Sequence, residues 1–163
     1  MIRVVLTVFL AIALLAVSMP ALEDARRDTT VERLETETHR LERVAGGLAA
    51  HSVAVGDPDL AARTSLVVSV PTGFAATPIE RIALAEPPRA AAMTERRVHR
   101  GAVVLVYRLR HGSVRTFPIA PPTGAVGVTL RDGPIELEPG GETGLELRLV
   151  DDGGPTVRIG RIA

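Results

Sequence analysis

The stretch Val4–Leu22, VVLTVFLAIALLAVSMPAL, determines how the rest of the chain is organised. It is apolar apart from Thr7, Ser18 and Pro20. As a helix that rises ~1.5 Å per residue it has a length of about 28 Å, which matches the hydrocarbon core of a bilayer. We therefore expect residues 1–22 to form a transmembrane anchor that contacts the membrane through residues 4–22.

The charged residues on either side of this stretch predict its orientation. Arg3 and the amino terminus precede it, and residues 23–28, with three acidic and two basic side chains, follow it. Positive charge is enriched on the cytoplasmic side of membrane helices. We therefore expect a single-pass protein of the cell membrane, with a cytoplasmic N-terminus and its body outside. A cleaved signal peptide is the alternative, because Ala16-Val17-Ser18 offers small residues near a cleavage site.

Residues 23–50 are predicted to continue the helix as an amphipathic segment. No Gly or Pro interrupts them before Gly46-Gly47, and a stripe of apolar or small residues recurs at spacings of three and four. Pro20 is expected to kink the helix rather than end it, because neighbouring groups satisfy the freed carbonyl. The stripe either packs on the protein's own domain or forms a short coiled-coil seam. It consists of Val31, Leu34, Thr38, Leu41, Ala45 and Leu48.

A connector is predicted for residues 51–64 and a β domain for residues 65–163. From Ser65 onward the hydrophobic period changes to two, which is typical of half-buried strands. Turns rich in Gly and Pro separate seven or eight short strands, and Asp132-Gly133 is a strong hairpin signal. The fold class is therefore α+β, a long N-terminal helix followed by a small antiparallel sheet or sandwich that is expected to fold independently. The strands are expected near residues 65–70, 78–85, 102–110, 114–119, 126–130, 135–137, 145–149 and 157–159.

The composition excludes several classes of function. The chain has no cysteine, which excludes disulfides, thiolate zinc sites and cysteine nucleophiles. Its 19 basic and 19 acidic residues balance, and only 2% of the residues are aromatic. Such a chain lacks both the positive charge and the stacking surfaces on which nucleic-acid binding depends. No nucleic-acid partner is expected.

The sequence contains no recognisable catalytic or metal-binding motif. The four histidines have no second ligand at metal-binding spacing, and neither a Gly-x-Ser-x-Gly elbow nor a phosphate-binding glycine loop occurs. Asp57-Pro58-Asp59 and Asp151-Asp152-Gly153 do not match a calcium loop, and we predict that they are turns whose carboxylates bond their own backbone. We expect a non-enzymatic protein without a cofactor.

Two blocks of opposite charge lie in the predicted β domain. From Arg89 to Arg115 the chain has seven Arg and one acidic residue, whereas from Arg131 to Asp152 it has seven acidic residues and two Arg. Either the blocks pair across neighbouring strands, or they lie on opposite flanks and let identical or related subunits associate head to tail. The candidate interaction residues are Arg96, Arg97, Arg100, Arg108, Arg110, Arg115, Glu136 and Glu138.

The order of these segments resembles type IV pilins and pseudopilins, in which a membrane helix continues as an amphipathic helix and precedes a small antiparallel sheet. More narrowly, the stretch from MIRVVL at residues 1–6 through PALEDAR at residues 20–26 resembles an uncharacterised family of small haloarchaeal membrane proteins associated with pilus or secretion machinery. Val5 lies where most pilins have a glutamate that guides assembly. The resemblance therefore implies a minor or accessory component of such an assembly rather than a major pilin.

Two functions follow from these observations. The first is a non-enzymatic, membrane-anchored accessory component of a pilus or secretion assembly, whose partners are itself or other subunits of that assembly. The alternative is an exported small binding module whose apolar leader is a cleaved signal peptide. The mass of the mature protein and its presence in the membrane fraction distinguish the two.

Overall fold

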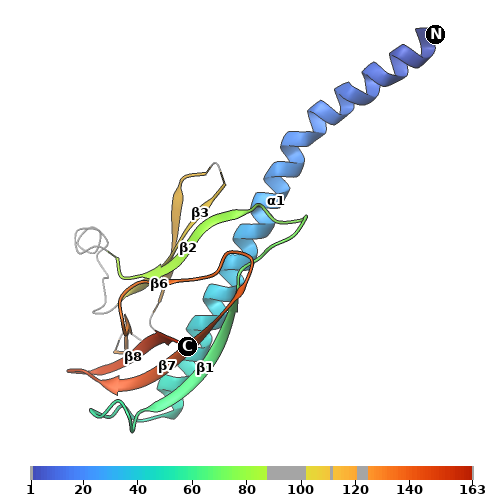
Figure 1. Cartoon of the computed structure of the whole chain (residues 1–163). Helices are drawn as coiled ribbons and strands as arrows, with labels where there is room; N and C mark the ends of the chain where they lie inside the picture. Colours follow the sequence, from blue (N-terminus) through green and yellow to red (C-terminus); the bar gives the residue numbers. More distant parts are fainter. Residues whose placement is uncertain (1, 88–101, 111, 121–124, 163) are drawn as a thin grey trace.

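The computed structural model of the protein describes residues 2–87, 102–110, 112–120 and 125–162. Within these residues the chain forms one long helix and eight strands, and the helix projects far beyond the β domain (Figure 1). This arrangement confirms the predicted α+β fold. The elements are α1 (Ile2–His51), β1 (Ala62–Ser69), β2 (Ile79–Ala85), β3 (Val103–Leu109), β4 (Val114–Ile119), β5 (Gly127–Leu130), β6 (Ile135–Glu136), β7 (Glu142–Asp151) and β8 (Pro155–Arg161).

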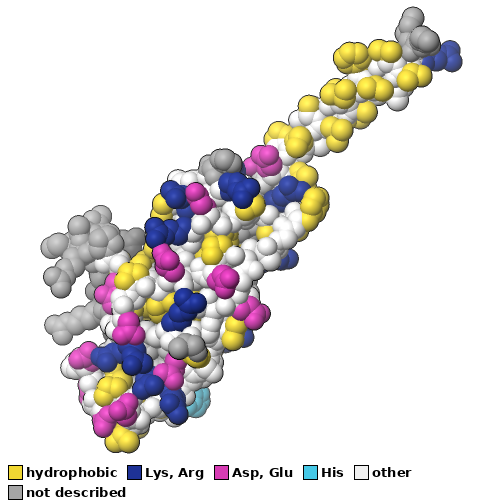
Figure 2. Space-filling view, viewed as in Figure 1, with side chains coloured by type: hydrophobic (Ala, Val, Ile, Leu, Met, Phe, Trp, Pro, Cys, Tyr) yellow, Lys and Arg dark blue, Asp and Glu magenta, His cyan; other side chains and the backbone are white. Residues whose placement is uncertain are grey.

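The first half of α1 makes no packing contact with the β domain. Every side chain from Arg3 to Ala25 is exposed, although most of them are apolar, and Figure 2 shows these hydrophobic side chains along the projecting part of the helix. The helix continues through Pro20, as predicted. It is long and apolar enough to cross a membrane, and an exposed apolar surface of this length is unfavourable in water.

The second half of α1 belongs to the hydrophobic core. Leu34, Leu41 and Ala45 are only 1–2% exposed and lie in the same cluster as the buried strand residues. Val31 and Leu48 pack against that cluster, so the predicted stripe packs on its own domain. Thr30 and Thr38 are buried as well, and Thr38 satisfies its hydroxyl by donating to the Leu34 carbonyl at 2.9 Å.

The strands form two four-stranded sheets that face each other across this core. Sheet A has the order β1-β7-β8-β5, and sheet B has the order β4-β3-β2-β6. The helix contacts β1, β7 and β8 of sheet A and β4 of sheet B, so it packs against both sheets along one side of the sandwich. Among the described strands all pairings are antiparallel except that of β5 with β8, which is parallel, and a single parallel bridge joins Val55 to Val150.

The predicted hairpin at Asp132-Gly133 is wrong. Gly133 does turn the chain, with φ +86°, but the strands on either side of it belong to different sheets. Val128 in β5 pairs with Val157 in β8, whereas Ile135 in β6 pairs with Leu84 in β2. Each of the two short strands has one buried face. The chain crosses from sheet A to sheet B between them, and each strand packs its buried face against the core. The sequence signal identifies the turn but not its pairing partners.

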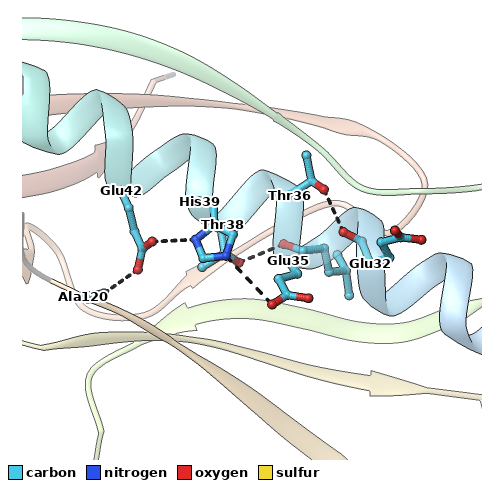
Figure 3. A network of polar contacts seen from close by, with 8 residues as sticks. Glu32, Glu35, Thr36, Thr38, His39, Glu42 and Ala120 are labelled. Carbon is cyan, nitrogen blue, oxygen red and sulfur yellow. Dashed lines mark hydrogen bonds and ion pairs between the residues drawn. The ribbon is translucent and has the colours of Figure 1, made fainter.

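Three hydrogen bonds join α1 to the β domain. The Thr77 backbone N–H donates to the Thr30 hydroxyl at 2.8 Å, and an Arg40 guanidinium nitrogen donates to the Val67 carbonyl at 3.3 Å. The Ala120 backbone N–H donates to Glu42 at 2.8 Å. The other carboxylate oxygen of Glu42 lies 2.8 Å from Nδ1 of His39, which is exposed as predicted (Figure 3).

The second half of α1 lies in the core, so the expectation that residues 65–163 fold independently is revised. We predict that the β domain does not fold without the second half of α1. The buried side chains of Leu34 and Leu41 each contribute about 1.5–3 kcal/mol by burial, which is a large part of a typical stability of about 5–15 kcal/mol. A fragment of residues 62–163 should show no cooperative thermal transition by circular dichroism, whereas a fragment of residues 23–163 should unfold cooperatively. Equal transitions in the two fragments would contradict the shared core.

The single substitution Leu34→Ala tests the packing of α1 against the sheets. This substitution should lower the free energy of unfolding by about 2–5 kcal/mol, because it leaves a cavity between the helix and both sheets. Leu15→Ala on the same helix is the matched control, since Leu15 is 65% exposed and should leave the stability of the β domain unchanged. Chemical denaturation of the full chain in detergent micelles measures both.

Candidate interaction surface

The outer face of sheet B is a floor of small apolar side chains with charges at one end. Residues that alternate along a strand point to opposite faces, so the residues between the buried Ile82, Leu84 and Leu105 face outward. They are the half-buried Ala83, Ala85, Val104 and Val106. Glu136 and Arg108 face outward beside them, because they pair with the outward residues Ala83 and Arg81.

Two ion pairs cross the charged end of this face, and both use β2. Arg81 lies 2.6 Å from Glu136 of β6, and Arg108 of β3 lies 3.0 Å from Glu80. The register shifts between Ile79 and Arg81, and this β-bulge lets Glu80 and Arg81 both reach the outer face. Arg81 and Arg108 are direct cross-strand partners, and the two carboxylates offset the repulsion between them.

Strand β2 therefore separates the predicted basic block from the predicted acidic block. Arg108 and Glu136 lie on the same face but pair with β2 residues rather than with each other. Arg110, Arg115 and Glu138 are exposed and form no ion pair with any residue that the structure describes. The structure thus places Arg108 and Glu136 on the same face, one on each side of β2, and gives Glu138 no ion pair with either of them or with β2. Arg96, Arg97 and Arg100 lie outside the described residues.

A depression of about 320 Å³ opens on this face between Arg81, Val106, Val114 and Pro134. Its walls are apolar, and its charged groups are already paired. Tyr107 also borders it; burial raises the pKa of this phenol and the nearby Arg115 guanidinium opposes the rise, so the hydroxyl stays protonated. Such a surface suits contact with side chains of another protein more than proton transfer.

The outer face of sheet A has a different charge pattern. Arg63, Arg148 and Arg158 are direct neighbours on β1, β7 and β8. Glu146 offsets this row of like charges, because its carboxylate accepts a hydrogen bond from Arg148 at 2.5 Å. This bond and the nearby guanidinium groups lower the pKa of Glu146.

The turns around this row support its charges. Arg148 also donates to the Pro58 carbonyl at 3.1 Å and lies 3.7 Å from Asp59. The Asp59 backbone N–H donates to the Asp57 carboxylate at 2.9 Å, which confirms that this segment is a turn. The Gly154 N–H likewise donates to Asp151. No group of three or more His, Asp or Glu side chains in the described part of the chain could hold a metal ion.

Sequence reasoning missed the residues that organise both surfaces. Glu80 and Arg81 belong to neither charge block, and the Arg63–Arg148–Arg158 row draws one residue from each of three strands. A cluster of this kind has no signal in any single segment, because it depends on the register between strands. The strand pairing that brings these charges together cannot be read from any one segment of the sequence.

Comparison with known proteins gives one match. A family model described as Domain of unknown function (DUF7311) matches residues 1–162. The matched region therefore includes the projecting helix and both sheets. No curated protein and no solved structure matches the chain.

We predict that Glu146 makes the fold sensitive to acid. Because its pKa is lower in the folded than in the unfolded protein, its carboxylate stabilises the fold above the ordinary glutamate pKa of ~4.3, and the contribution is lost as the pH falls through the lowered value. Glu146→Gln should therefore destabilise the protein at neutral pH, and the difference from the wild type should shrink in acid. Urea unfolding across this range measures it, and Glu138→Gln is the control.

We also predict that the Arg108–Glu80 pair is a weak internal contact. Both side chains are about half exposed, so a double-mutant cycle of Arg108→Ala and Glu80→Ala should give a coupling energy of about 0.2–1 kcal/mol. The coupling should fall at high salt, because screening weakens exposed pairs. A salt-independent coupling of several kcal/mol would mean that the pair is shielded from water.

Proposed function

The chain belongs to the family described as Domain of unknown function (DUF7311), and we propose that it is a membrane-anchored, non-enzymatic subunit of a pilus-like or secretion assembly. In this proposal residues 4–22 span the cell membrane, the N-terminus is cytoplasmic, and the β domain lies outside. The partners are other copies of the chain or other subunits of the same assembly.

One observation carries the proposal: the first half of α1 is exposed and apolar, whereas its second half is part of the core of the β domain. Residues Arg3–Ala25 are exposed and mostly apolar, whereas Leu34, Leu41 and Ala45 lie in the core of the β domain. The helix is continuous from Ile2 to His51, so anything that fixes the position of its first half also fixes the β domain. A helix that links an apolar segment to a folded domain resembles the plan of pilins and pseudopilins, and this resemblance supports the proposal.

The surfaces of the β domain support a role in protein contacts. The apolar outer face of sheet B offers Ala83 and Val106, and the charges at its end can align a partner. Neither outer face offers a described cluster of nucleophile, base and orienting residue. The alternative, an exported module with a cleaved leader, differs in one respect: its mature chain lacks the apolar stretch.

We predict that the anchor is retained and the β domain is outside. Protease added to spheroplasts should digest the protein beyond Glu23 and leave the N-terminal peptide in the membrane, because the bilayer shields only residues 4–22. A cytoplasmic marker protein that stays intact is the control. Recovery of a soluble mature protein without its first ~20 residues, the usual length of a signal peptide, would instead support the exported module.

We further predict that charge reversal separates internal pairing from assembly. Arg108→Glu with Arg110→Glu should reduce self-association of residues 23–163 in sedimentation at low salt, if Arg108 and Arg110 meet acidic residues of a second subunit. Glu136→Arg with Glu138→Arg should then restore it, whereas Glu80→Arg should restore only the internal pair. Salt should weaken association, because the Debye length falls from ~10 Å at 0.1 M to ~3 Å at 1 M. A fragment that stays monomeric at high concentration in low salt would contradict assembly through these charges.

A further inference from the structure

Three segments meet at the end of the β domain from which the exposed part of α1 projects. The Thr77 N–H donates to Thr30 of the helix at 2.8 Å, and the Arg110 N–H donates to the Pro78 carbonyl at 2.9 Å. The loop between β1 and β2 (residues 70–78) therefore lies against the helix (Figure 1), and the end of β3 at Leu109 and Arg110 lies beside that loop. We call this region, together with Arg26 of the helix and with Val114 and Arg115 at the start of β4, the helix-exit end.

The helix-exit end carries two large apolar side chains that face solvent. Phe74, at the tip of the 70–78 loop, is 85% exposed, and Val114 is 60% exposed. The Arg26 guanidinium lies over the Phe74 ring at 4.5 Å from its centroid, which is a cation–π contact that holds the ring beside the helix. Phe74 thus faces solvent and is not covered by the core. Burial of an aromatic side chain is strongly favourable, so its exposure is unusual.

The helix fixes the depth at which Phe74 would meet a membrane. Arg26 follows Leu22, the last residue of the apolar stretch, by one helical turn, or about 6 Å along the axis. The headgroup layer on each side of a bilayer is about 5–8 Å thick. If residues 4–22 fill the hydrocarbon core, Arg26 and the ring against it lie at the level of the headgroups, where aromatic side chains are enriched.

The charges at the helix-exit end suit phospholipid headgroups. Arg110 and Arg115 are exposed and form no ion pair with a described residue, and guanidinium groups bind phosphate well. Two acidic groups nearby are already neutralised, since Asp24 lies 3.7 Å from Arg27 and Glu80 lies 3.0 Å from Arg108. Glu23 and Asp28 on the helix and Glu138 and Glu142 at the neighbouring turn are exposed as well, so the phosphate contacts depend on the position of Arg110 and Arg115 and not on the net charge of this end.

We propose that the helix-exit end docks on the surface of the same bilayer that holds α1, with Phe74 and Val114 in the headgroup layer and Arg110 and Arg115 on lipid phosphates. This inference rests on the proposed membrane anchor and adds a second membrane contact, which is made by the β domain itself. The helix and this contact together restrain the tilt of the β domain relative to the membrane.

Tryptophan fluorescence tests the docking, because the chain contains no Trp and each substitution introduces a single reporter. Phe74→Trp keeps an aromatic ring under Arg26, Phe9→Trp reports on the anchor, and Leu60→Trp lies in the connector at the opposite end of the domain, where Leu60 is 77% exposed. The full chain is placed in nanodiscs of phosphatidylcholine and phosphatidylglycerol that carry bromine at shallow or deep positions of the acyl chains.

We predict that the Phe74→Trp emission is blue-shifted and quenched, more by shallow than by deep bromine, while the Leu60→Trp emission is unaffected. Phe9→Trp should be quenched strongly by deep bromine. If Phe9→Trp is quenched and Phe74→Trp behaves like Leu60→Trp, the docking proposal is overturned and the anchor stands. If Phe9→Trp is not quenched, the anchor is overturned, and the docking that rests on it is overturned too.

A charge variant tests the phosphate contacts in the Phe74→Trp background. Arg110→Glu with Arg115→Glu should reduce the blue shift and the quenching, whereas Arg43→Glu with Arg63→Glu, which are exposed Arg residues away from the helix-exit end, should change neither. Circular dichroism shows whether each variant stays folded. Undiminished quenching in a folded Arg110→Glu/Arg115→Glu protein would overturn the assignment of these two residues to lipid phosphates.

Discussion

The insertion of the second half of α1 into the open side of the sandwich is the contact on which the rest of the structure depends. Two four-stranded sheets leave apolar edges where they do not meet. Here Leu34, Leu41 and Ala45 belong to the same buried cluster as residues of both sheets, and the helix contacts strands of both. A chain of this size without disulfides has only packing to hold it together. The helix is therefore both a connector and part of the core.

Because one helix joins the core to the apolar stretch, the β domain has a defined position relative to that stretch. A flexible linker would let the domain rotate and move away, whereas α1 is continuous from Ile2 to His51. The hydrogen bonds that Thr30 and Glu42 accept from the sheets resist rotation of the domain about the helix.

The charges are arranged to cancel locally rather than to divide the domain into a basic and an acidic half. Arg108 and Glu136 each find a partner on β2, and Glu146 lies among the Arg residues on the outer face of sheet A. Exposed pairs of this kind contribute little to stability. Their arrangement instead determines which groups remain available at the surface, and Arg110 and Arg115 at the helix-exit end are the clearest examples.

The sequence by itself determined the elements, because local periodicity carries them. The apolar stretch, the stripe around Leu34 and the positions of the strands all follow from spacings of 3.6 or two residues. Only the tertiary structure decided which strands pair, that β5 runs parallel to β8, that β2 separates Arg108 from Glu136, and that Phe74 lies against Arg26. A period of two is satisfied by many strand orders, and the choice among them depends on packing between residues far apart in the chain.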